Sequence, residues 1–201
     1  MTYVASGGKA IGVLGITDPV RPSSVEAIKR LKALGIEPVL MSGDIPQIAE
    51  RVAREVGIDR FYSQVRPEDK ARYVKELQSQ GKIVAMVGDG INDAPALAQS
   101  NVGIAIGSGT DVAAQAANVV LMKSDPIDIS RAIRLSKATV RKMKQNLAWA
   151  SVYNVLAIPV AAGVFYNSLG WSLRPEVSAL LMSLSSIIVA VNAVSLRRAK
   201  I

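Results

Sequence analysis

The sequence predicts an α/β domain with a parallel sheet, followed by a transmembrane helical hairpin. Strand-like and helix-like segments alternate over the first 125 residues, and two uncharged apolar runs of about 20 residues follow them. The charge divides at nearly the same place, since residues 1–128 carry a net charge of −1 and residues 129–201 carry +9. We therefore predict three parts: a partial α/β domain at 1–125, an amphipathic connecting helix at 126–145, and a hairpin with a basic cytoplasmic tail at 146–201.

The elements of the first part follow from apolar periodicity, proline and glycine. In chain order they are a buried strand at 10–16, a helix at 20–35, a strand and turn at 37–44, a helix ending near residue 57, a helix at 67–81, and strands at 82–90, 102–107 and 118–122. This order predicts a parallel sheet with helices on both faces. Its chemistry is then expected at the carboxyl ends of the strands.

The composition excludes several kinds of site. The chain has no cysteine and no histidine, so disulfides, thiolate chemistry and imidazole-based triads or zinc sites cannot form within it. A metal bound here must use oxygen, amide or thioether ligands.

The two apolar runs at 146–166 and 177–196 are each long enough to span a bilayer. Basic residues flank their outer ends, at Arg141, Lys142, Lys144, Arg197, Arg198 and Lys200. This flanking is typical of cytoplasmic ends and not of a nucleic-acid surface. We expect a multi-pass protein of the plasma (inner) membrane, with the lipid bilayer as a partner and both ends cytoplasmic. A pair of buried helices in a soluble core is the alternative.

Polar residues cluster where the predicted strands end. Ser42, Gly43 and Asp44 close one strand, Lys70 lies early in a helix, and Asp89, Asn92 and Asp93 lie on a glycine-rich turn after another strand. A hydroxyl and an ammonium can bind phosphate oxygens, and carboxylates can hold Mg²⁺, so this set suits phosphoryl transfer.

Each of these residues also has an ordinary structural interpretation. Lys70 alone is typical of a solvated surface lysine, and Ser42 of a turn residue. Asp44 is typical of a helix N-cap, and Asn92 can cap the helix that follows it. The combination, and not any one residue, points to a phosphate site.

The motifs resemble the phosphorylation domain of P-type ATPases, which has a haloacid-dehalogenase-like fold. The resemblance rests on SGD at 42–44, PEDK at 67–70, GDGINDAPAL at 88–97 and ITDPVRPS at 16–23. It runs over nearly the whole chain and is closest to the heavy-metal, copper-transporting branch. It implies that the chain is a C-terminal portion, comprising the end of the phosphorylation domain and the last two membrane helices.

The resemblance implies a role for each matched residue. Asp89 would ligate Mg²⁺ with Asp93 supporting it from nearby, and Asn92 would organise the site around the phosphoryl group. Lys70 would neutralise an aspartyl phosphate. Ser42 would bond a phosphate oxygen within the loop that Gly43 and Asp44 complete; the family usually has threonine at this position, and serine keeps the hydroxyl.

The phosphorylated aspartate of the family lies in a DKTGT motif, and no DKTG sequence occurs in these 201 residues. We expect this chain to act with the remaining part of the ATPase, which comprises the nucleotide-binding domain, the actuator domain and the first six membrane helices. ATP would be bound mainly by that part. The isolated chain is predicted to be inactive.

The predicted hairpin carries polar and thioether side chains near mid-depth, at Tyr153, Asn154, Met182 and Ser186. Such groups are costly in lipid and are therefore site candidates. Thioether sulfur suits Cu(I) or Ag(I), and neither run contains a carboxylate for a hard divalent ion. From spacing alone, close helix packing at the serines and space-filling by Met182 remain an alternative. The resemblance implies that the four residues line a copper path; it does not separate Cu(I), Cu(II) and Ag(I).

Two other functions compete with a pump component. A membrane-tethered phosphatase of the same superfamily would need a DxD nucleophile, and TDP at 17–19 is a poor substitute. A non-catalytic membrane partner or remnant, which binds copper or a pump through its hairpin, is consistent with the sequence.

Overall fold

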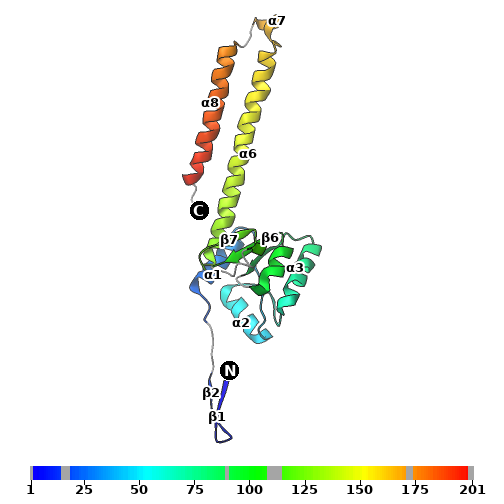
Figure 1. Cartoon of the computed structure of the whole chain (residues 1–201), viewed down its shortest axis with the longest axis vertical. Helices are drawn as coiled ribbons and strands as arrows, with labels where there is room; N and C mark the ends of the chain where they lie inside the picture. The colour runs from blue at the N-terminus through cyan, green and yellow to red at the C-terminus, as the bar shows by residue number, and fades with distance from the viewer. Residues whose placement is uncertain (1, 15–18, 89–90, 108–114, 171–173, 199–201) are drawn as a thin grey trace. The chain divides into compact units, whose positions relative to one another are not determined.

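The computed structural model describes residues 2–14, 19–88, 91–107, 115–170 and 174–198, and the chain divides into two compact units, Met1–Ser130 and Arg131–Ile201 (Figure 1). The first unit holds every strand that the structure describes. The second holds most of one long helix and all of another.

The first unit begins with an antiparallel hairpin of β1 (Thr2–Ser6) and β2 (Lys9–Leu14). Gly7 and Gly8 form its turn with φ of 58° and 77°, a left-handed conformation that favours glycine. The prediction that the strand at 10–16 is buried was wrong. Ile11 is 65% exposed, because β2 pairs with β1 alone and lies outside the parallel sheet.

The rest of the first unit confirms the predicted alternation. Its elements are α1 (Pro22–Ala33), β3 (Val39–Met41), α2 (Pro46–Val56), β4 (Arg60–Tyr62), η1 (Pro67–Asp69), α3 (Lys70–Ser79), β5 (Ala85–Gly88), η2 (Ile91–Asp93), α4 (Ala94–Gln99), β6 (Val102–Ile106) and β7 (Val119–Leu121). Strand β3 pairs with β4, and β5, β6 and β7 pair in that order. Both sheets are parallel, as predicted.

The core lies between α3, α4 and the strands β5 and β6. Val74, Met86, Ala96 and Leu97 form its centre, and Met41 of β3 packs against them. Helix α4 approaches the sheet so closely that a Cβ on Gly103 would lie 2.8 Å from the carbonyl oxygen of Leu97. Glycine at this position therefore sets the distance between helix and strand.

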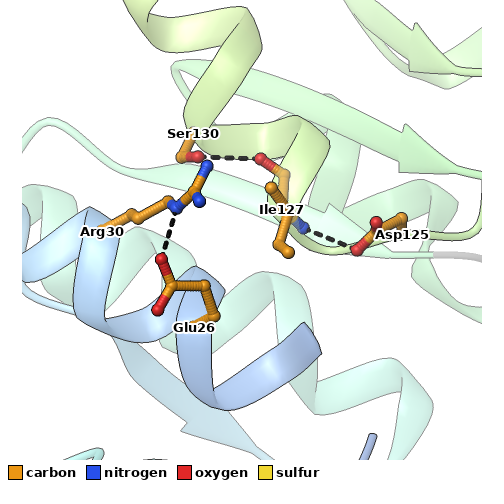
Figure 2. A network of polar contacts seen from close by, with 5 residues as sticks. All are labelled: Glu26, Arg30, Asp125, Ile127 and Ser130. Atoms are coloured by element: carbon orange, nitrogen blue, oxygen red, sulfur yellow. Dashed lines mark hydrogen bonds and ion pairs between the residues drawn. The ribbon is translucent and has the colours of Figure 1, made fainter. Parts of the chain in front are cut away.

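The start of the long helix α6 (Ile127–Ala161) is fixed by its own polar groups (Figure 2). The carboxylate of Asp125 accepts a hydrogen bond of 3.0 Å from the backbone N–H of Ile127, and the buried Ser130 hydroxyl donates to the Ile127 carbonyl at 2.8 Å. The Arg21 guanidinium, before α1, donates to the Ser124 carbonyl at 2.8 Å. The first two bonds stabilise the first turn of α6, and the third holds the segment just before it to the residue that precedes α1.

Figure 2 also shows the ion pair within α1, where Arg30 donates to Glu26 at 2.7 Å. This hydrogen bond, aided by the arginine's charge, holds the pKa of Glu26 below its ordinary value.

The second unit is a hairpin of α6 and α8 (Pro175–Val194), with the short helices α7 (Tyr166–Leu169) and η3 (Ser195–Arg198) (Figure 1). The predicted connecting helix does continue into the first apolar run. That helix ends at Ala161, before the predicted 166, because Gly163 with φ of 76° ends it.

Within the described residues, one helix is long and apolar enough to cross a membrane. It spans Glu176–Arg197 with a mean hydropathy of 2.1. The predicted hairpin is therefore observed as a pair of helices, and the prediction of a membrane span is supported for the second of them alone.

We predict that Gly103→Ala destabilises the first unit, because the added Cβ must move α4 away from the sheet. The free energy of unfolding should fall by about 1–3 kcal/mol, the usual effect of overpacking a core. Denaturant titration of the purified chain measures it. Gly12→Ala is the control, since a Cβ there has no heavy atom within 4 Å, and equal effects of both substitutions would contradict the packing argument.

Candidate functional site

The loop after β3 carries Ser42, Gly43 and Asp44 and is held by the segment after β4. The backbone N–H of Ser42 donates to the Tyr62 carbonyl at 2.9 Å, continuing the β3–β4 pairing beyond the strand. The Ser42 carbonyl in turn accepts from the N–H of Val65 at 3.0 Å. These bonds hold the loop at the carboxyl end of β3.

The Ser42 and Asp44 side chains bond to each other. The Ser42 hydroxyl donates to the Asp44 carboxylate at 2.7 Å and accepts from the Asp44 N–H at 3.2 Å. The N-cap position of α2 is Ile45 and no side chain caps that helix. The helix-cap interpretation of Asp44 was therefore wrong; Asp44 is exposed and Ser42 is half-buried.

Lys70 and Asp93 form the most buried ion pair that the structure describes. The ammonium lies 2.7 Å from the Asp93 carboxylate, and the two side chains are 21% and 10% exposed. Lys70 is the first residue of α3 and Asp93 ends η2, so the pair joins two elements 23 residues apart. The interpretation of Lys70 as a solvated surface lysine was wrong.

Gly88 makes room for this pair at the end of β5. A Cβ at residue 88 would lie 2.6 Å from both the Cβ and a carboxylate oxygen of Asp93. Any other residue would therefore displace the Asp93 side chain. Gly88 belongs to the glycine-rich turn seen in the sequence, and the structure gives a steric reason for glycine at this position.

The remaining motif residues are Asn92 and Asp89. Asn92 is exposed on η2, and the N-cap position of α4 is Asp93, so the capping role suggested for Asn92 was wrong. Asp89 lies outside the described residues. Within the part of the chain that the structure describes, no hydrogen bond or ion pair links the Ser42–Asp44 pair to Lys70–Asp93.

The hairpin candidates lie on α6 and α8. Asn154, Met182 and Ser186 are exposed, with Met182 at 61%, and the Ser186 hydroxyl donates to the Met182 carbonyl at 3.2 Å. Tyr153 lies in α6, and its side chain is outside the described part of the structure.

The sequence analysis missed two features. The segment Gln64–Val65 supports the Ser42 loop through backbone bonds, for which its side chains give no signal. Asn146 and Asn192 bond to each other across the hairpin at 2.7 Å. Their signal was an amide near the outer end of each apolar run, beside the flanking basic residues, where an apolar residue would otherwise be expected.

The parallel strands and the Lys70–Asp93 pair are consistent with a haloacid dehalogenase-like domain. Two family models described as haloacid dehalogenase-like hydrolase match this chain, at residues 2–101 and 70–133.

Relatives extend the match over almost the whole chain. A copper-exporting P-type ATPase B of Archaeoglobus fulgidus is 52% identical over 98% of this chain and 28% of its own length. A copper-exporting P-type ATPase of Vibrio cholerae is 50% identical over 98% of this chain and 22% of its own. A crystal structure of a zinc-transporting PIB-type ATPase in the E2.Pi state has a TM-score of 0.81 at 33% identity, covering 96% of this chain and 31% of that one.

The chain belongs to the P-type ATPase family. It spans roughly a quarter of the length of the two curated relatives, at 28% and 22%.

We predict a coupling free energy between Lys70 and Asp93 of about 1–3 kcal/mol in a double-mutant cycle of the two alanine substitutions, because removal of either partner leaves the other charge largely buried and unpaired. Denaturant unfolding of the four proteins measures it. The control is Lys82–Glu37, an exposed pair 3.5 Å apart, whose coupling should stay below about 1 kcal/mol. Indistinguishable couplings would show that the buried pair has no special energetic role.

Proposed function

We propose that this chain is part of an ATP-driven copper (or silver) pump, to which it contributes phosphate-stabilising groups, Mg²⁺-binding groups and part of the metal path. The buried Lys70–Asp93 pair is the observation that carries the proposal. A lysine held by a carboxylate, at the carboxyl end of a parallel sheet, keeps an ammonium ready to neutralise a phosphorylated carboxylate. The curated relatives that match the chain are copper-exporting P-type ATPases.

The acceptor carboxylate must come from a segment outside these 201 residues. Strand β3 pairs with β4 and β5 pairs with β6, and no ladder joins β3 to β5 in the described part of the chain. Met41 at the end of β3 nevertheless packs against the core that contains Met86 of β5. A further parallel strand between β3 and β5 would end beside Ser42 and Asp93, where the phosphate-binding groups are proposed to act.

Within this arrangement the side chains have separate roles. Asp93 holds the Lys70 ammonium and so fixes where its positive charge lies. The Ser42 hydroxyl can turn from Asp44 to a phosphate oxygen, since the loop backbone that carries it is held by bonds to Tyr62 and Val65. Gly43 keeps this loop free of side-chain bulk, and Asn92 is exposed on the neighbouring turn to organise the phosphoryl group.

The carboxylates also suit Mg²⁺. Asp93 offers a hard oxygen donor that is nearly buried, with one oxygen bonded to Lys70 and the other beside Gly88. Asp89 would be the direct ligand, and Asp93 would support it from nearby. When bound, Mg²⁺ would neutralise charge on the phosphoryl group.

The metal path is proposed on the hairpin. Tyr153, Asn154, Met182 and Ser186 occupy apolar runs without a charged residue, which favours a soft monovalent ion over a hard divalent one. Residues 146–201 then act as a multi-pass membrane part with both ends cytoplasmic, joined through 126–145 to the partial phosphorylation domain at 1–125. Nucleotide binding, actuation and the other membrane helices belong to the remaining part of the ATPase.

The isolated chain is predicted to incorporate no acid-stable label from ATP, because it contains no DKTG acceptor. Incubation with γ-labelled ATP and Mg²⁺, followed by an acid gel, makes the measurement. The full-length ATPase that contains this sequence is the positive control. Label on the isolated chain would contradict the proposed division of roles.

In that full-length ATPase, Met182→Ala should reduce Cu(I)-stimulated ATP hydrolysis by at least about tenfold at limiting copper, because a soft ligand is lost. Met122→Ala is the matched control, since Met122 is 83% exposed and lies outside the hairpin. Unchanged stimulation at limiting and saturating copper would remove Met182 from the metal path.

A further inference from the structure

A polar cluster joins α6 to α8 near the cytoplasmic end of the hairpin. The Lys142 ammonium donates to the Asn192 side-chain oxygen at 2.8 Å, and the Asn192 amide nitrogen donates to the Asn146 side-chain oxygen at 2.7 Å. All three side chains are partly buried. We call Lys142, Asn146 and Asn192 the amide clasp.

The amide clasp has one satisfied arrangement. An ammonium can only donate, so Lys142 fixes which end of the Asn192 amide faces it, and the other end must then donate to Asn146. Sliding one helix by a single turn, about 5.4 Å, would break both bonds. The clasp therefore selects one register between the two antiparallel helices.

This register brings the hairpin candidates to similar heights. With a rise of about 1.5 Å per residue, Asn154 lies about 12 Å along α6 from Asn146. On α8, Ser186 lies about 9 Å and Met182 about 15 Å from Asn192 in the same direction. Asn154 is thus level with the space between Ser186 and Met182.

The register also places these three side chains on one face of the hairpin. With about 100° of rotation per residue, Asn154 is turned about 80° from Asn146. Met182 and Ser186 are turned about 80° and 120° from Asn192 in the opposite sense. Since Asn146 and Asn192 face each other, opposite rotations on facing helices lead to the same side.

The other face provides a check on this geometry. An apolar groove there is lined by Trp149, Ile187, Ile188, Val191, Asn192 and Ser195. The same rotation turns Trp149 and Val191 to the side opposite Asn154 and Met182. The groove and the three residues Asn154, Met182 and Ser186 therefore occupy different faces of the hairpin. This agrees with the groove lining, which contains none of the three.

We propose that Asn192 is a positioning residue, which fixes the register of α6 against α8 so that Asn154, Met182 and Ser186 open together on one face of the hairpin. This inference rests on the proposed function, because the metal path is what the register serves. Asn192 itself lies about 9 Å from Ser186 and about 15 Å from Met182 along α8, so its role is to position those residues and not to bind the metal.

The register is tested by cross-linking the 201-residue chain in lipid vesicles. The chain has no cysteine, so any cross-link forms between the two introduced cysteines. Asn154→Cys with Met182→Cys should link through a short bismaleimide, in which each thiol adds to one maleimide double bond. Asn154→Cys with Val189→Cys should link poorly, because Val189 lies about 7.5 Å below the level of Asn154. Cleavage after Glu176 by a glutamate-specific endoprotease then separates unlinked helices on a denaturing gel, because Glu176 is the only acidic residue in 129–201.

Adding Asn192→Leu should lower linking of the 154–182 pair by at least about fivefold, as the selected register loses population, and should raise linking of the 154–189 pair. An unchanged pattern would overturn the proposal. If both pairs lose linking, the Asn146→Leu variant decides the question. It removes one bond of the clasp and should cause a smaller change of the same kind. An unchanged linking pattern in that variant would also overturn the proposal.

A functional measurement separates positioning from general stability. In the full-length ATPase, Asn192→Leu should raise the half-stimulating Cu(I) concentration by about tenfold while the maximal rate stays within about twofold. Asn192→Asp should restore the parent value, because its carboxylate accepts from Lys142 and from a rotated Asn146 amide. A maximal rate that falls without a change in half-stimulating concentration would contradict positioning.

Ser195→Ala is the matched control, since that hydroxyl donates only to the Asn192 backbone carbonyl, at 2.6 Å, and its loss should change neither parameter. If the parent ATPase shows no stimulation by Cu(I), the proposed function fails. The cross-linking pattern then still decides whether Asn192 sets the register.

Discussion

The ion pair between Lys70 and Asp93 is the interaction on which the site depends. A charged pair this buried costs desolvation on both sides, and it persists only when the surrounding backbone holds the partners in place. Three separate elements provide that support. Helix α3 carries the lysine, η2 carries the aspartate, and Gly88 at the end of β5 leaves the space that the carboxylate fills.

The sheet that supports this pair is built from short strands. Strands β3 and β5 are three and four residues long, and no ladder bonds join them in the described part of the chain. Met41 of β3 instead packs against the core that contains Val74 and Met86. This explains how the first unit brings the ends of β3 and β5 to one region, while the two strands belong to separate ladders.

Much of this fold follows from sequence periodicity. The alternation of apolar strands with amphipathic helices predicted α1, β3, α2, α3, β5, β6 and β7, and GDGINDAPAL pointed to the turn that holds Asp93. The short strand β4 was not predicted. The β1–β2 hairpin was mistaken for one buried strand, although Gly7-Gly8 between two strand-like segments is a local hairpin signal. The pairing of Lys70 with Asp93 and that of Asn146 with Asn192 were out of reach, because each depends on how distant segments pack and no local pattern encodes that.

Pro159 leaves one backbone carbonyl of α6 without its usual helical hydrogen bond. Proline has no amide hydrogen, so it cannot donate to the carbonyl of Val155 one turn earlier. That oxygen remains an acceptor in the apolar part of the helix, directly after Asn154 in the chain. In an apolar environment such an oxygen must be satisfied by a neighbouring polar group or by water, so the hydration of this part of α6 depends on what surrounds the hairpin.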